Sequence, residues 1–488
     1  MKAFRAALSI GLITTGVLTV GASASATPLL VTGESTVVST ADGPAPAVTH
    51  ATGTLADGAT WIADLPSNWN GTLLLFSHGY GPPVAADSPD QAGAKAALLN
   101  RGYALVGSSY DPNGSWWALD SAVGDQFQAM DAMESGVLPH QPRQVLAVGE
   151  SMGGLISALE AQDGAGRIDG ALTTCGIVAG GINLNNYQLD GEYTLAKLLL
   201  PGQPVQLVGF QGAGDASPTV AALSAAAAAA QQTASGRARL ALAMAFINVP
   251  SWSSEQNPPP PVNDPVAQEA GQYAVEFSDL FAIPGVFPNT LGFIEGSRYS
   301  LNQADGGGIA TWTRGVDFAS LLRNSPYENE VEKLYRKAGL NLRDDLATLT
   351  TNADIAADPA AVYSLKETSV PTGHLDVPEL DMHTVADQLV PVQQESFYAE
   401  QVRRAGSGEL LRQAYVASVG HCNFSPAELV AGVQAVSQRI ASGHWGSVAE
   451  PKKLEQVATG LNLGAARFVQ FHPGNLTGVN GPYNPAKN

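Results

Sequence analysis

The stretch that decides the fold is VLAVGESMGGLISALEA, residues 145–161. It opens as a short apolar run, holds a serine between glycines, and continues as an amphipathic run. An apolar run, a glycine turn and a helical pattern in that order predict a buried strand that passes through a sharp turn into a helix. Ser151 lies at the turn itself, and its polar side chain there suggests a functional role for the hydroxyl.

The five residues GESMG, 149–153, match the pattern G-x-S-x-G. Small residues beside the serine permit a strained turn that pushes the hydroxyl of Ser151 out at the carboxyl end of the sheet. The backbone N–H of Met152 then points to the place where an oxyanion forms during acyl transfer. The alternative is a tight turn with an incidental serine, because the pattern also arises by chance in glycine-rich chains.

A serine hydroxyl is a weak nucleophile and needs a histidine as its general base. Of the eight histidines, His421 lies in VGHCNFSPAE, just after the last expected strand and before a helical pattern. A carboxylate must fix the tautomer of that histidine. Asp387 in HTVADQLVP follows another expected strand. The competing Asp381 lies inside that strand, so the Asp381 side chain is expected to face a neighbouring element. His383 also lies inside the strand. The expected catalytic residues are therefore Ser151, Asp387 and His421.

Other residues are expected to bind the transition state or the substrate. The segment SHGYG follows an apolar run and offers the backbone N–H of Tyr80 as a second oxyanion donor, with Gly79 as the alternative. Trp116 and Trp117 lie in a loop after another expected strand, and one of the pair is expected to touch substrate. Glu150 either binds a substrate amine or buttresses the turn, and the structural role is favoured.

Along the rest of the chain, short apolar runs alternate with helical patterns, which predicts an α/β fold with a mostly parallel central sheet flanked by helices. The alternation stops at about residue 181, where an Ala-rich helical run, a proline-rich break and several short helical patterns follow. We predict a first core part over 27–180, a mainly helical cap inserted over 181–372 before the acid-bearing strand, and a second core part over 373–488. The tail from Trp445 is rich in glycine and asparagine and is expected to wrap the core.

The amino-terminal segment, 1–26, has the pattern of a secretory signal peptide. Lys2 and Arg5 give a positive start, an apolar stretch follows, and ASASA offers small residues for cleavage near Ala24 to Ala26. A membrane anchor is the alternative, but the apolar stretch is short and no later run of about 18 apolar residues follows. The sequence therefore predicts a secreted protein without stable membrane association.

The charge balance argues against several partners. The chain of 488 residues has 25 Lys and Arg against 44 Asp and Glu, a formal net charge of −19. An acidic surface without a basic run repels nucleic acid and anionic membranes. No H-E-x-x-H pair, phosphate-binding loop or dinucleotide fingerprint is present, so neither a metal nor another cofactor is expected.

The two cysteines, Cys175 and Cys422, form an even count, which in an exported protein favours one disulfide. Cys175 ends an expected strand and Cys422 follows His421, so both are expected near the carboxyl edge of the sheet. A disulfide there would pin the loop that carries the histidine. Two separate buried thiols are the alternative.

Residues 72–180 and 376–442 resemble the α/β-hydrolase superfamily, and the segments SHGYG, GESMGG, ADQLVP and GHCNFSPAE are similar to exported bacterial carboxylesterases and aminopeptidase-like enzymes. The order serine, aspartate, histidine agrees with that family. The resemblance implies a secreted serine hydrolase that cleaves a small-molecule carboxylic ester through an acyl-enzyme intermediate. An amidase or aminopeptidase-like peptidase with the same three residues is the alternative, and a non-catalytic binding module on the same fold is the remote one.

Overall fold

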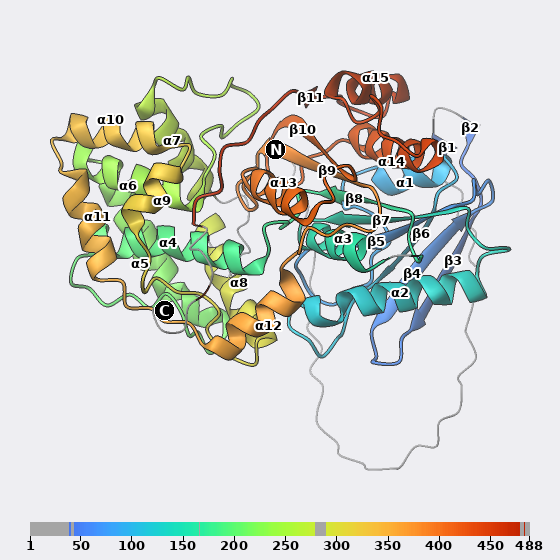
Figure 1. The fold of residues 1–488 in the computed structure, drawn as a ribbon, viewed down its shortest axis with the longest axis horizontal. Helices are drawn as coiled ribbons and strands as arrows, with labels where there is room; N and C mark the ends of the chain where they lie inside the picture. The colour runs from blue at the N-terminus through green and yellow to red at the C-terminus, as the bar shows by residue number, and fades with distance from the viewer. Residues whose placement is uncertain (1–38, 41–42, 165, 279–288, 479–482, 484–488) are drawn as a thin grey trace, which may run out of the picture.

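The computed structural model describes residues 39–40, 43–164, 166–278, 289–478 and 483 (Figure 1). The expected signal peptide, with its cleavage site, lies outside the described residues. None of the helices in the described ranges is long and apolar enough to cross a membrane.

Within the described residues, the main sheet has nine strands in the order β3-β4-β6-β5-β7-β8-β9-β10-β11. The pairs β3–β4, β4–β6 and β10–β11 are antiparallel, and every other neighbouring pair from β6 to β10 is parallel. This is the topology of an α/β-hydrolase sheet, so the predicted fold class is confirmed. The strands are β3 (Val48–Thr54), β4 (Thr60–Pro66), β5 (Thr72–Ser77), β6 (Ala104–Ser108), β7 (Gln144–Glu150), β8 (Gly170–Thr174), β9 (Glu379–Ala386), β10 (Leu411–Val419) and β11 (Phe468–Val469), and a separate pair joins β1 (Ser39–Thr40) to β2 (Gly43–Pro44).

The central strands are apolar on both faces because helices cover both sides of the sheet. In β5 every residue of TLLLFS is buried, a pattern typical of a parallel strand between two helical layers. The buried clusters place α1, α14 and α15 on one face and α2, α3 and α13 on the other (Figure 1). These helices are α1 (Ala94–Asn100), α2 (Leu119–Gly136), α3 (Met152–Asp163), α13 (Gln394–Ala405), α14 (Pro426–Ser442) and α15 (Pro451–Leu461).

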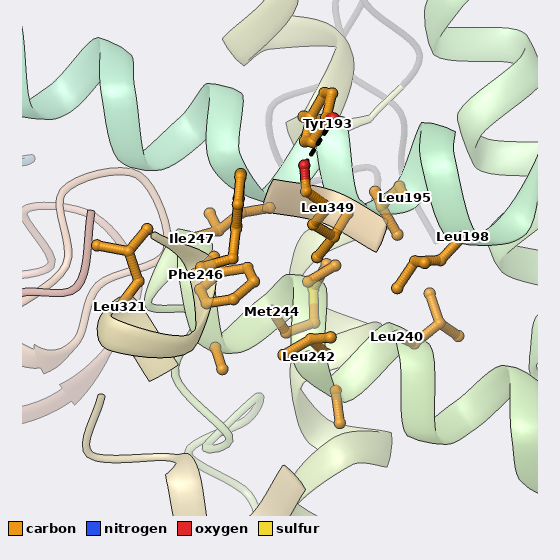
Figure 2. Close-up of a cluster of buried hydrophobic side chains, with 14 of the residues drawn as sticks. Tyr193, Leu195, Leu198, Leu240, Leu242, Met244, Phe246, Ile247, Leu321 and Leu349 are labelled. Atoms are coloured by element: carbon orange, nitrogen blue, oxygen red, sulfur yellow. Dashed lines mark hydrogen bonds between the residues drawn. The ribbon is translucent and has the colours of Figure 1, made fainter. Parts of the chain in front are cut away.

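The chain between β8 and β9 forms a helical layer of its own beside the sheet (Figure 1). Its apolar side chains make a separate core in which α4 packs against α6 (Figure 2). The hydroxyl of Tyr193 donates to the carbonyl of Leu349 at 3.0 Å inside this core. The helices are α4 (Gly181–Leu199), α5 (Ser217–Ala230), α6 (Ala234–Ile247), α7 (Pro265–Glu276), α8 (Thr290–Ala304), α9 (Phe318–Asn324), α10 (Glu328–Ala338), α11 (Leu342–Thr351) and α12 (Pro359–Ser369), with a 3₁₀ turn over Ala213–Ala216.

The carboxyl-terminal tail is more regular than its glycine and asparagine content indicates. It forms α15, which buries Leu454 and Ala458 one helical turn apart, and then β11, which adds an antiparallel edge strand to β10. Beyond β11 the tail reaches the cap (Figure 1). There Asn248 accepts from the backbone N–H of Thr477 at 2.9 Å and donates to its carbonyl at 3.1 Å. The tail therefore fastens the end of α6 to the core.

Candidate active site

The serine of the opening stretch lies in a strained turn between β7 and α3. Ser151 has φ 61° and ψ −121°, a backbone conformation that L residues rarely adopt and that costs about 1–3 kcal/mol. A side chain at Gly149 would collide with the backbone of Gly153, and one at Gly153 would collide with the carbonyl of Ser77. The two glycines of the motif are therefore required by the close approach of strand, turn and helix.

Two hydrogen bonds connect three residues that are far apart in the sequence. The Ser151 hydroxyl lies 2.8 Å from His421 Nε2, and His421 Nδ1 donates to Asp387 Oδ2 at 2.7 Å. The other carboxylate oxygen of Asp387 accepts from the backbone N–H groups of Leu389 and Val390, both at 2.9 Å. This arrangement places Nε2 of the imidazole where it can take a proton from the serine, as in a Ser-His-Asp triad.

The two candidate acids of β9 and the loop after it differ in their surroundings. Asp387 is fully buried, which by itself would raise its pKa, but the charge of His421 and its hydrogen bond lower that pKa below the usual range. Asp381 is also fully buried, and desolvation together with the nearby Glu395 raises its pKa well above the usual range. Asp387 is thus the ionised partner of His421, and Asp381 lies in a separate acidic cluster.

Ser151 and His421 open into a cavity of about 360 Å³ between the core and the cap. Its walls are mostly apolar, and cap helices α4 and α8 contribute Leu184 and Phe293. Glu150 and Asp90 also line it. The cavity is large enough for a small acyl group and part of a leaving group, and these two carboxyl groups are among the polar groups in its lining.

Of the two expected oxyanion donors, Tyr80 lines the cavity, and Met152 directly follows Ser151. Met152 is the first residue of α3, where the N–H groups of a helix have no partner within the helix. Gly79 and Tyr80 both line the cavity, and a side chain at Gly79 would lie 3.3 Å from Ser151 Cβ. The Tyr80 hydroxyl donates to Ser300 of α8 at 2.7 Å, which holds this loop against the cap.

The two tryptophans of the loop before α2 have different positions. Trp117 lines the cavity, and its indole N–H donates to Ser369 at 3.3 Å. Trp116 lies outside in a neighbouring hollow, is 39% exposed, and packs edge-on against Tyr80 with ring centroids 5.6 Å apart. Of the pair, Trp117 is the one placed where a bound substrate would touch it.

The disulfide between Cys175 and Cys422 is present, as the sequence predicts. It joins the turn after β8 to the loop that carries His421, and the two Cα atoms lie 5.3 Å apart. Within the described residues, Cys175, His421 and Cys422 are the one group whose ligating atoms lie close enough for a metal. Both sulfurs are bonded to each other and the imidazole to Asp387, so the residues present do not fit a metal.

Sequence reasoning missed a second histidine beside the acid. His383 Nδ1 lies 2.8 Å from Glu395 Oε1, while its Nε2 donates to the carbonyl of Val390 at 2.8 Å and lies 3.6 Å from Asp387 Oδ2. Because Val390 also donates its N–H to Asp387, His383 holds the turn that carries the acid. His383 lies only four residues before Asp387 in the sequence, which was the available sign that the two are close. The expectation that His383 is an ordinary strand residue left this sign unused.

Comparisons with known proteins return hydrolases. No family model matches the chain. An o-phthalyl amidase of Xanthobacter agilis is 28% identical over 465 residues, covering 90% of this chain and 98% of the relative. Among solved structures, feruloyl esterase B from Aspergillus oryzae is 13% identical with a TM-score of 0.38 and covers 84% of this chain and 85% of its own. Tannin acyl hydrolase from Aspergillus niger is 13% identical with a TM-score of 0.38, covering 83% and 82%.

Proposed function

Since the chain is a hydrolase of the α/β-hydrolase fold, we propose that it cleaves carboxylic esters through an acyl-enzyme intermediate formed on Ser151. The observation that carries this proposal is the pair of hydrogen bonds from Ser151 through His421 to Asp387. A serine at the turn between β7 and α3 does not need these two hydrogen bonds to fold. Because Ser151 lines the cavity, these hydrogen bonds make its hydroxyl a nucleophile that a substrate can reach.

The reaction follows from the positions of these groups. The Ser151 oxygen attacks the substrate carbonyl carbon while His421 Nε2 takes the hydroxyl proton, and Asp387 holds the resulting imidazolium. The backbone N–H groups of Met152 and Tyr80 would stabilise the oxyanion. Collapse of this intermediate breaks the bond to the leaving group, which receives the proton from His421. Water then attacks the acyl carbon while His421 takes its proton, and the bond to the Ser151 oxygen breaks as that oxygen receives the proton, which releases the acid and the free serine.

Amide cleavage is the second candidate, and the relative of nearly full length favours it because its printed name is that of an amidase. An amine leaves only when it is protonated, and His421 can supply that proton as it does for an alcohol. A non-catalytic binding module on this fold would have no use for an intact triad, so we set that function aside.

The cavity sets the size of substrate that we propose. Its volume of about 360 Å³ and its mostly apolar walls fit a small aromatic or branched acyl group, with Trp117 against it. Trp116 would contact only a substrate that extends past Tyr80 into the neighbouring hollow. Glu150 is the polar side chain nearest in sequence to the nucleophile, and we propose that it contacts substrate as well.

Export from the cytoplasm remains part of the proposal. The positively charged and then apolar amino-terminal segment supports it, and so does the Cys175–Cys422 disulfide, because disulfides persist mainly in oxidising compartments. Sequencing the amino terminus of the protein recovered from the culture medium of an expressing bacterium tests it. A mature protein that begins between Ser25 and Thr27 is expected, and retention of Met1 on cell-bound protein would contradict export.

The test of the proposed function compares p-nitrophenyl esters of graded acyl length with the matching p-nitroanilides. Ester turnover with an optimum at short or aromatic acyl groups would support the ester assignment and give the size of the acyl subsite. A higher kcat/KM for the anilides would move the function to amide hydrolysis. Absence of turnover on both series would contradict the proposal.

Removing the disulfide is expected to lower the free energy of unfolding by about 4–5 kcal/mol, because the bond closes a loop with a sequence separation of 247 residues. The double variant Cys175→Ser/Cys422→Ser should also lose activity, since Cys422 adjoins His421. Urea unfolding and ester turnover measure the two effects. Reductant should bring the wild type to the behaviour of the variant and leave the variant unchanged. Equal urea midpoints for the two proteins would contradict this role.

The turn held by His383 gives a second prediction. His383→Gln is expected to lower kcat by about 10-fold to 100-fold with little change in KM, because a misplaced Asp387 misorients His421. The control is Glu379→Gln, which alters the same buried cluster at a residue bonded to Thr173 and Tyr398 instead. A kcat that falls equally in both variants would point to general loosening of the core and not to the acid turn.

A further inference from the structure

One wall of the catalytic cavity presents hydrogen-bond acceptors that have no donor. Glu150 Oε1 accepts from the side-chain amide of Gln91 at 2.9 Å, whereas Glu150 Oε2 is buried and has no hydrogen-bond partner among the residues that the structure describes. The same Gln91 nitrogen donates to the carbonyl of Cys422 at 2.9 Å, so the amide oxygen of Gln91 is left as a second buried acceptor without a partner. Asp90 is the second acidic residue, after Glu150, that lines this cavity.

These contacts fix where the acceptors lie relative to the reacting atoms. Glu150 directly precedes Ser151, and Gln91 bridges Glu150 to Cys422, the residue after His421. Gln91 therefore ties the side chain of Glu150 to the loop that carries the general base, in the same cavity lining as Ser151 and His421. A ligand group that bonds to Glu150 Oε2 would lie within a few atoms of the carbonyl that Ser151 attacks.

The electrostatics of this wall call for a cation. Burial, with a smaller contribution from the charge of Asp90, raises the pKa of Glu150 to about 7, although the hydrogen bond from Gln91 and the charge of His421 act in the opposite direction. A buried carboxyl oxygen without a donor is costly, because its lone pairs are unpaired and, when the group is ionised, its charge is desolvated as well. A positively charged N–H group would remove both penalties, since it supplies the donor and the counter-charge.

We propose that Glu150 and Asp90 form a subsite for an ammonium group of the substrate, so that this hydrolase acts on aminoacyl esters or amides. The inference rests on the proposed function, because the subsite adjoins the same nucleophile. Glu150 is the last residue of β7 and Asp90 lies between β5 and α1, so both acids belong to the core and not to the cap. The substrate class differs from that in the printed name of the relative, whose o-phthalyl group carries an anionic carboxylate at neutral pH.

Three phenyl esters of nearly equal shape test the proposal. They are the phenyl esters of alanine, of isobutyric acid and of methylmalonic acid, which place an ammonium, a methyl or a carboxylate group on the same carbon. The wild type is expected to prefer the alanine ester over the isobutyrate ester by about 10-fold or more in kcat/KM, mainly through KM, and to act least on the anionic ester. Equal rates, or preference for the neutral or anionic ester, would overturn the subsite.

Charge-removing variants separate a binding role from a structural one. Glu150→Gln should lower the ratio of kcat/KM for the alanine ester to that for the isobutyrate ester by about 10-fold to 100-fold, and Asp90→Asn should lower it less. Glu150→Asp keeps the charge and should restore part of the ratio. The control is Asp111→Asn in the neighbouring hollow, which removes one acidic charge outside the cavity and should leave the ratio unchanged. If Glu150→Gln slows both esters equally, Glu150 only supports the turn.

A binding measurement keeps this inference separate from the proposed function. Calorimetry on the Ser151→Ala protein with alaninamide and with isobutyramide requires no turnover. Tighter binding of alaninamide that is lost in Ser151→Ala/Glu150→Gln would support the subsite even if no ester is cleaved. Equal binding of the two amides would overturn the subsite, while ester turnover by the wild type would still support the proposed function.

Discussion

Alanine at position 151 is expected to lower kcat for ester hydrolysis by a factor of about 10⁴ to 10⁶ and to leave KM nearly unchanged. The Ser151 hydroxyl lies 2.8 Å from His421 Nε2. Removing this hydroxyl therefore prevents formation of the acyl-enzyme but does not remove a group that binds the substrate. Any rate above that of water would then come from the oxyanion donors and from positioning in the cavity. Release of p-nitrophenol under steady-state conditions measures kcat and KM together.

Two further variants make this result specific. Ser297→Ala changes a serine that lines the same cavity but donates to the Ile294 carbonyl within α8, and it is expected to keep most of the activity. The double variant Ser151→Ala/His421→Ala should be no slower than Ser151→Ala alone, because residues that act as a unit are not additive. Activity that survives Ser151→Ala would mean that another group is the nucleophile.

Local sequence patterns predict the core of this molecule because each of them has a structural reason that acts over a few residues. The motif at 149–153 needs glycines where β7, the turn and α3 approach each other, and the structure has those close approaches. The apolar runs become buried parallel strands since a strand covered on both faces has no polar side. The disulfide follows from two cysteines that both end up at the carboxyl edge of the sheet.

The remaining features depend on contacts between distant segments, which a local pattern does not contain. The tail was expected to wrap the core on the strength of its composition, but its edge strand exists only because β10 offers an unpaired side at Tyr415 and Val416. Nothing in the residue types of Trp116 and Trp117 indicates which one the cap leaves in the cavity. The pairing of His383 with Glu395 requires α13 to lie across β9, and so it could not be read from the strand alone.

Asparagine at position 387 is expected to lower kcat/KM by about 10⁴-fold at neutral pH, the size of effect that follows from a wrong histidine tautomer. Asp387 Oδ2 accepts the proton of His421 Nδ1 at 2.7 Å. An amide nitrogen there would donate instead, so Nδ1 would have to accept and the imidazole proton would move to Nε2. Nε2 would then face the Ser151 hydroxyl as a donor and could no longer take its proton. The bonds from Leu389 and Val390 to the other oxygen persist, so the fold should survive.

The competing acid in the same strand provides the matched control. Burial and the neighbouring Glu395 raise the pKa of Asp381 well above its usual range, which favours the neutral carboxyl group, and asparagine is also neutral and has nearly the same shape. Asp381→Asn should therefore change kcat/KM by no more than about threefold. Circular dichroism and thermal unfolding of both variants would exclude misfolding as the cause. If Asp381→Asn abolished turnover while Asp387→Asn did not, the hydrogen bond between Asp387 and His421 would have no catalytic role and the acid would have to be sought in the Asp381–Glu395 cluster.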